Sequence, residues 1–235
     1  MEKGQPNVRE LALGLLDAFP KLDDAKRKVA LATYRRLARG VPAPPAEIAA
    51  DVGADPDEVR RILGDWVGVY TDDEGRVIGF WGLAIPRMKH RFEVDGVRLH
   101  TWCAWDALFL PELLGKTARV ESACETSGWP VRLTVSRTAV ESAEPASPVL
   151  SFLAPEASRF QGDVIKNFCH YVHFFRSRED GEAWVARNPG TFLLTLDEAV
   201  ELARQKNRLQ FGAALCETAE RHETMKLEKQ DRSKP

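Results

Sequence analysis

One stretch in the middle of the chain, residues 91–115, constrains the fold more than any other. Residues 91–102 form two strand-like runs joined by Asp95-Gly96, and this pattern is typical of a hairpin closed by a tight turn. Residues 104–114 predict a short helix that ends at a glycine. We therefore expect a β-strand to lead directly into Cys103, with this cysteine at or near the start of the helix.

A thiol and a carboxyl group lie three residues apart here, at Cys103 and Asp106. That spacing places both on one helix face. The positive end of the helix dipole would favour the thiolate of Cys103, making it a better nucleophile and a better ligand for soft metals. The helix start favours the carboxylate of Asp106, whereas a thiolate neighbour and the aromatic residues at 102, 105 and 109 favour the protonated acid.

A carboxyl group that can take a proton from a thiol and pass it on can serve as an acid catalyst. A simpler interpretation stays open on these two residues alone. Asp106 would then be only an acid in the first turn of a helix, and Cys103 only a small buried apolar residue.

The composition is that of an ordinary globular protein. The 235 residues suffice for one large or two small domains, and 44% of them are hydrophobic and 29% charged. A net charge of -2 gives no global electrostatic case for binding nucleic acid or an anionic membrane. The sequence has no apolar run long enough to span a membrane and no signal peptide pattern, so we expect a cytoplasmic protein.

The four cysteines are widely scattered, at positions 103, 124, 169 and 216, and none forms a C-x-x-C pair. In a reducing compartment this distribution argues against a disulfide framework and against the common zinc modules. Folding could still bring distant cysteines together in one site.

Residues 1–84 predict a winged-helix-like N-terminal domain, because helices are followed by two short strands. The expected helices are 8–19, 23–39, 46–51 and 56–66, and the expected strands are 67–70 and 76–83. In a DNA-binding winged helix, helix 56–66 would enter the major groove. It offers Arg60 and Arg61 but also three acidic residues, so we expect a packing or lid domain instead.

Residues 85–216 predict an α/β domain with mostly antiparallel short sheets, so the fold class is α+β, and residues 217–235 predict a charged, flexible tail. The expected strands are 117–122, 131–136, 149–153 and 191–195, and the expected helices are 179–186 and 196–215. Residues 136–144 are expected to be a connection with a helical turn, and 155–161 a turn or short helix. Residues 167–175 predict a buried strand whose alternation would place Cys169 and His173 on one face.

Three motifs together resemble the organomercurial (alkylmercury) lyase family. They are Trp102-Cys103-Ala104-Trp105-Asp106, Arg119-Val120-Glu121-Ser122-Ala123-Cys124, and the segment from Asn167 to Phe175. The similarity covers residues 25–210 in order, and the combination is more specific than any single motif. The resemblance implies cytosolic protonolysis of a carbon–mercury bond and a winged-helix-like domain joined to an unusual α/β domain.

Position by position, the resemblance implies that Cys103, Asp106 and Cys169 are the catalytic and mercury-binding residues, while Cys124 matches a cysteine that is structural in the family. His170 stands where some relatives carry another cysteine, and Cys216 has no counterpart. Soft Hg(II) prefers thiolate sulfur, so two cysteines suit a site for it. One thiolate would bind the organomercurial, the second would add, and Asp106 would deliver a proton to carbon.

The expected partners are a small organomercurial substrate, low-molecular-weight thiols as co-reactants and a mercuric reductase that accepts the Hg(II) product. No cofactor, nucleic acid or membrane is expected, and the chain should be a monomer or a weak homodimer.

Two alternatives to this function stay open. One is a zinc site of Cys103, Cys124, Cys169 and His173, although the spacing matches no common zinc motif. The other is a winged-helix metal-responsive transcription regulator, which would require metal-dependent DNA binding.

Overall fold

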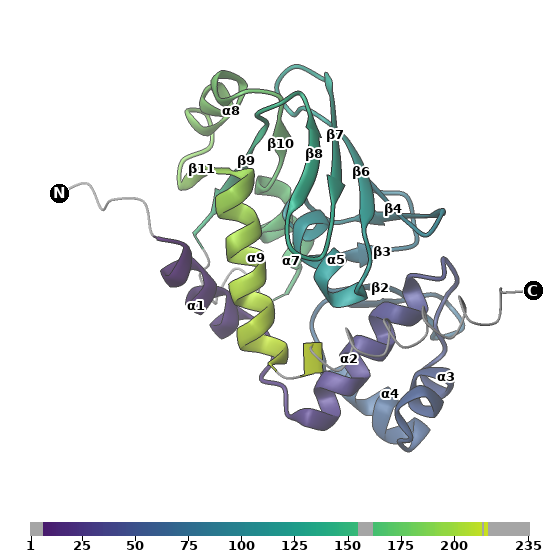
Figure 1. The fold of residues 1–235 in the computed structure, drawn as a ribbon. Helices are drawn as coiled ribbons and strands as arrows, with labels where there is room; N and C mark the ends of the chain where they lie inside the picture. The colour runs from purple at the N-terminus through teal and green to yellow at the C-terminus, as the bar shows by residue number, and fades with distance from the viewer. Residues whose placement is uncertain (1–6, 155–161, 213, 216–235) are drawn as a thin grey trace, which may run out of the picture.

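The computed structural model describes residues 7–154, 162–212 and 214–215, which form helices packed around two antiparallel sheets (Figure 1). The helices are α1 (Val8–Ala18), α2 (Asp24–Leu37), α3 (Pro45–Val52), α4 (Pro56–Asp65), α5 (Asp106–Leu114), α7 (Val164–Asn167), the 3-10 turn η1 (Cys169–Tyr171), α8 (Arg178–Val185) and α9 (Leu196–Phe211). The strands are β1 (Val69–Thr71), β2 (Val77–Phe80), β3 (Leu83–Ala84), β4 (His90–Val94), β5 (Val97–Thr101), β6 (Ala118–Ala123), β7 (Pro130–Val135), β8 (Val140–Glu144), β9 (Val149–Leu153), β10 (Phe174–Phe175) and β11 (Thr191–Thr195).

The mixed α+β class is confirmed, and the larger sheet has eight strands in the order β1-β2-β3-β5-β4-β6-β7-β8. The hairpin predicted at its centre is present, with Val94 paired to Val97 across a two-residue loop. Asp95 and Gly96 both have positive φ, 50° and 78°, as the tight turns that match strand twist require. This hairpin delivers Cys103 at the end of β5.

The edge strand β8 corrects one expectation. Residues 136–144 were predicted to be a connection with a helical turn, but Val140–Glu144 form a strand that pairs with β7. Most side chains of β8 are exposed or half-buried, so its sequence carries little of the alternation that marks a strand. Pairing with a neighbour therefore decided its structure.

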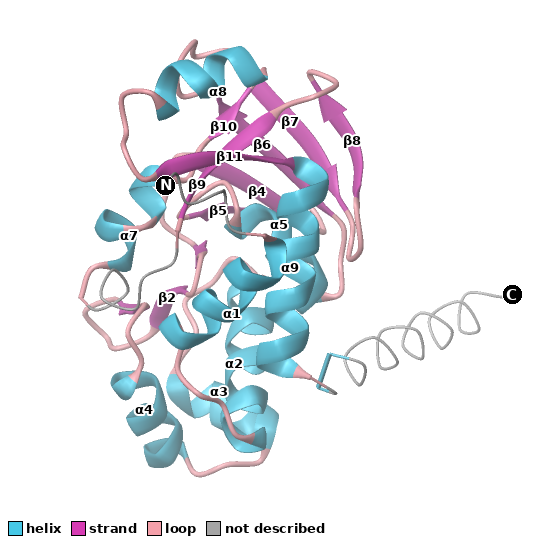
Figure 2. Cartoon of the chain, turned by 90° about the vertical axis from the view of Figure 1, so that its left-hand side faces the viewer, coloured by secondary structure: helices cyan, strands magenta, loops and turns pink. Residues whose placement is uncertain are grey.

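The smaller sheet has the order β10-β9-β11, and every residue of its central strand β9 is buried. Thr195 ends β11 and caps α9 through a reciprocal capping box with Glu198. Helix α9 then runs beside α1 and α5 across the molecule (Figure 2). Within the part of the chain described, no helix combines the length and apolar character that crossing a membrane needs.

The N-terminal helices begin and end within two residues of their predicted limits, and Asp23 caps α2 by accepting the Lys26 N–H at 2.9 Å. Their buried side chains, such as Leu15 and Tyr34, belong to the same core as the residues around Cys103. Strand β3 pairs with β5 across the predicted domain boundary at residues 84–85. The division into domains stays a prediction. The predicted turn at 155–161 and the tail at 217–235 lie outside the described residues.

One buried charge lies where three helices meet. Lys206 on α9 is fully buried, and its Nζ lies 4.7 Å from the ring centre of Phe19 and 4.2 Å from that of Phe109. Burial lowers the pKa of Lys206 to about 7, although the negative charges of Asp106 and Glu112 oppose that shift. The protonated lysine is therefore costly in the folded protein at neutral pH.

We expect Lys206→Met to raise the free energy of unfolding at pH 7 by about 1–4 kcal/mol, because replacing a buried charge with an apolar side chain is often stabilising. The unfolded chain keeps the lysine protonated up to its ordinary pKa of 10.5, whereas the folded chain releases the proton near pH 7. Wild-type stability should therefore rise with pH between these values, and the gain of the variant should shrink. Denaturant unfolding at pH 7 and 9.5 measures both effects.

The exposed Lys28 on α2 offers a matched control, since Lys28→Met removes a charge that already lies in solvent and should not give the same gain in stability at pH 7. A Lys206→Met variant that is less stable than wild type at pH 7, or whose gain does not vary with pH, would contradict this account.

Candidate active site

Strand β5 runs directly into Cys103, as predicted, but helix α5 begins slightly later than expected. Its first residue is Asp106 and Trp105 is the N-cap, so Cys103 lies in the loop before the helix. The next residue, Ala104, donates its N–H to the Val172 carbonyl at 3.1 Å. This bond ties the Cys103 loop to the segment that carries the second cysteine.

The carboxyl group of Asp106 folds back onto that loop and accepts the Cys103 N–H at 2.8 Å. Space for it depends on Gly82, whose φ is +99°. A Cβ atom at this position would lie 2.6 Å from the Asp106 Cγ. Gly82 could not be found from the sequence, because a glycine between two short strands carries no local signal of what packs against it.

Cys169 reaches the site on an irregular segment, and the strand predicted over 167–175 is wrong. Asp163 caps α7 by accepting the Lys166 N–H at 3.1 Å, η1 follows, and only Phe174–Phe175 form a strand. Of the residues that suggested a strand, Phe168 and Val172 are buried and Tyr171 is half-buried in the irregular part of the segment. Cys169 is 5% exposed.

The structure brings the two predicted cysteines and the aspartate together. The sulfur atoms of Cys103 and Cys169 and a carboxylate oxygen of Asp106 all lie within 4.8 Å of one another, and all three residues are buried. Two metal–sulfur bonds of about 2.3 Å each, the length found for zinc, would bridge a gap of this size. One soft metal ion could therefore contact both sulfurs.

Burial governs the acid–base properties of the carboxyl group. It raises the pKa of Asp106 to about 6, and hydrogen bonds from Cys103 and the charge of Lys206 limit the rise. Asp106 is thus mostly ionised at neutral pH yet holds a proton more readily than an ordinary aspartate. This matches the predicted competition of effects on Asp106.

The expectation that the helix start favours the thiolate of Cys103 is wrong. Burial raises the pKa of Cys103 well above its ordinary value, and a hydrogen bond to Cys169 and the charge of Asp106 add to the rise. The hydrogen bond from Cys103 lowers the pKa of Cys169, but burial and the charge of Asp106 outweigh it, so this pKa is also raised. A metal ion that binds these groups must displace protons, and Asp106 is the adjacent base.

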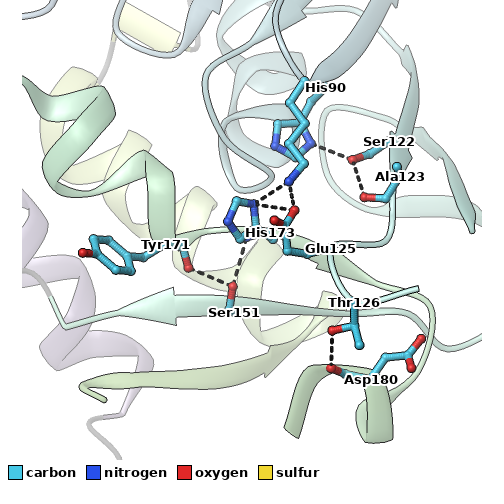
Figure 3. Close-up of polar contacts among 10 residues, drawn as sticks. His90, Ser122, Ala123, Glu125, Thr126, Ser151, Tyr171, His173 and Asp180 are labelled. Carbon is cyan, nitrogen blue, oxygen red and sulfur yellow. Dashed lines mark hydrogen bonds and ion pairs between the residues drawn. The ribbon is translucent and has the colours of Figure 1, made fainter. Parts of the chain in front are cut away.

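Other cysteine and histidine side chains lie elsewhere. The Cys124 thiol donates to Asp180 at 3.4 Å. His173 lies outside the cluster of Cys103, Asp106 and Cys169, and its Nδ1 lies 3.4 Å from Lys89 Nζ and 3.7 Å from a carboxylate oxygen of Glu125 (Figure 3). The four-residue zinc site is therefore wrong. Cys216 lies outside the described residues.

Comparison with known proteins agrees with this geometry. Residues 84–206 match the family model of the alkylmercury lyases. The chain is 39% identical over 170 residues to an alkylmercury lyase of Staphylococcus epidermidis, covering 72% of this chain and 77% of that protein. It is 40% identical over 168 residues to one of Pseudomonas putida, with the same coverage.

The chain belongs to the alkylmercury lyase family. The fold supports the assignment, because a crystal structure of the mercury-bound form of MerB2 superimposes with a TM-score of 0.65. That match covers 87% of this chain and all of the other, at 22% sequence identity, and so bears on the fold alone. In this member of the alkylmercury lyase family, the three residues singled out from the motifs form one buried cluster.

We expect Gly82→Ala to destabilise the protein by on the order of 2 kcal/mol or more, since a methyl group there would both strain the backbone and strike Asp106. Thermal unfolding measures the loss. Gly75 also has positive φ, +73°, but a Cβ there meets nothing within 4 Å, so Gly75→Ala isolates the backbone strain. Equal losses in the two variants would show that the packing against Asp106 contributes nothing.

Proposed function

We propose that this protein is an organomercurial lyase that cleaves the carbon–mercury bond of alkyl or aryl mercurials by protonolysis, releasing the hydrocarbon and Hg(II). The observation that carries the proposal is the buried cluster of two thiols and one carboxyl group in a chain of the alkylmercury lyase family. Soft Hg(II) favours sulfur ligands, and the carboxyl group supplies the proton donor that protonolysis needs.

In the proposed reaction, a thiolate from Cys103 or Cys169 displaces the small thiol that carries the organomercurial. The second cysteine then adds to mercury, and its proton passes to Asp106, which is mostly ionised at neutral pH. Asp106 delivers that proton to the carbon atom as the carbon–mercury bond breaks. The electron pair of that bond stays with carbon, and Hg(II) is left on two sulfurs.

Tyr70 and Trp102 are suited to hold the organic group. The indole of Trp102, next to Cys103, packs edge-on against the half-exposed ring of Tyr70 with 5.3 Å between ring centres. Burial raises the pKa of Tyr70, and the negative charges of Asp163 and Cys169 add to the rise. Trp105 and Phe109 lie in the core instead, where Trp105 packs on both Phe109 and Phe152.

Low-molecular-weight thiols would then remove Hg(II) by exchange and pass it to a mercuric reductase, without any cofactor. We further propose a cytoplasmic monomer or weak homodimer, and a winged-helix-like N-terminal domain that covers the site.

The alternative of a metal-responsive transcription regulator has no support from the comparisons. Its DNA-reading helix α4 also pairs Arg60 with Asp57 and Arg61 with Asp65, leaving little charge for phosphates.

The three site residues can be tested with phenylmercury and excess thiol, following benzene release. Cys103→Ser and Cys169→Ser should abolish turnover and weaken Hg(II) binding. Asp106→Asn should lower turnover by about 10²–10⁴-fold, the usual contribution of a general acid, while Hg(II) still binds the two sulfurs. Cys216→Ser is the control and should turn over normally. Wild-type rates in all three site variants would refute the assigned roles.

The source of the proton can be tested in heavy water. Protonolysis by Asp106 predicts that phenylmercury turned over in D₂O yields benzene carrying one deuterium, because carboxyl and thiol protons exchange with solvent. Mass spectrometry of the released benzene measures the label. Unlabelled benzene from the enzyme in D₂O would exclude proton delivery by an exchangeable group.

A further inference from the structure

The segment that carries Cys169 is held in place without the regular bonds of a long helix or strand. After η1 ends at Tyr171, the chain joins β10, which pairs with β9 only through Phe174 and Phe175. Residues 172–173 lie between these elements, and both are buried. Buried backbone groups need hydrogen-bond partners, and partners from outside the segment supply them.

Ser151 on β9 supplies most of these partners. Its hydroxyl donates to the Tyr171 carbonyl at 2.8 Å and accepts the His173 N–H at 3.0 Å, while its own N–H donates to the His173 carbonyl at 3.0 Å (Figure 3). Ser151 is fully buried on the central strand of the smaller sheet and pairs with Leu193 on the other side. Ser151 thus extends the contact between β9 and β10 to His173, one residue beyond the paired strands. One of these bonds is made by its backbone N–H and one by its hydroxyl.

The residue between these two contacts makes the link to the other cysteine. The Val172 carbonyl accepts the Ala104 N–H, and Ala104 follows Cys103. Because Ser151 holds the residues on both sides of Val172, it also holds the carbonyl that joins the two cysteine-bearing segments. A series of hydrogen bonds therefore connects β9 to the two segments that carry the cysteines.

We propose that Ser151 is a positioning residue that holds Cys169 at metal-bridging distance from Cys103. The purpose of this spacing rests on the proposed lyase function, whereas the spacing itself can be measured without any mercurial. Loss of the hydroxyl would leave the Tyr171 carbonyl and the His173 N–H without their partner and let the Cys169 turn move away from the Cys103 loop.

The test compares Ser151→Ala with Ser122→Ala. Ser122 is also buried, but its hydroxyl pairs with His90 Nδ1 at 2.8 Å and does not contact the Cys169 segment. The first measurement is the rate at which the oxidant diamide forms a disulfide between Cys103 and Cys169, identified by peptide mass spectrometry. The second is Hg(II) affinity in competition with a small dithiol. Both are made where circular dichroism shows each variant folded.

We expect Ser151→Ala to slow formation of this disulfide several-fold and to weaken Hg(II) binding by about 10- to 100-fold, as losing an outer contact to a metal ligand usually does. Ser122→Ala should match wild type in both. Wild-type behaviour of Ser151→Ala, or equal losses in the two variants, would overturn the proposal.

Should Ser151→Ala not fold, the pair Ser151→Thr and Ser151→Val carries the same test, because these side chains have the same shape and only threonine keeps the hydroxyl. The proposal is supported if only Ser151→Thr forms the disulfide at the wild-type rate. Equal rates of disulfide formation in Ser151→Thr and Ser151→Val overturn it. A wild-type protein that forms the disulfide but cleaves no phenylmercury would refute the proposed function. The disulfide rates of the variants would still decide the role of Ser151.

Discussion

The hydrogen bond from the Cys103 N–H to the Asp106 carboxyl group is the contact on which the site depends. It gives the buried carboxyl group a hydrogen-bond donor in place of water, and it holds the side chain folded back towards the Cys103 loop. Burial still dominates, so the pKa of Asp106 rises to about 6. A carboxyl group in this state can both accept and donate a proton near neutral pH, which is what proton transfer from sulfur to carbon would need.

Several buried groups around this contact also carry charge or polarity. Lys206 on α9 opposes the rise in the pKa of Asp106, although burial lowers the pKa of the lysine itself. Tyr34 on α2 donates its hydroxyl to the Trp81 carbonyl at 2.9 Å, next to the glycine that makes room for Asp106. Helices α2 and α9 therefore both place polar or charged groups near one carboxyl group.

The two sheets have different roles. The eight-stranded sheet delivers Cys103 at the end of β5, and the three-stranded sheet supports Cys169 through the main chain and hydroxyl of Ser151. The bond from Ala104 to Val172 joins the two halves. Hydrogen bonds between elements far apart in the sequence thus join the two segments that carry the cysteines.

The sequence alone determined the local features: the hairpin into Cys103, the limits of the N-terminal helices, the start of α9 and, through its combined motifs, the family and the three candidate residues. These depend on turn residues, caps and periodicity that act over a few positions. Only the tertiary structure decided that no strand forms before Phe174 in the segment 167–175, that residues 140–144 form a strand and that burial raises the pKa of Cys103. Each of these depends on what packs against the segment, because solvation and strand pairing are set by neighbours distant in sequence.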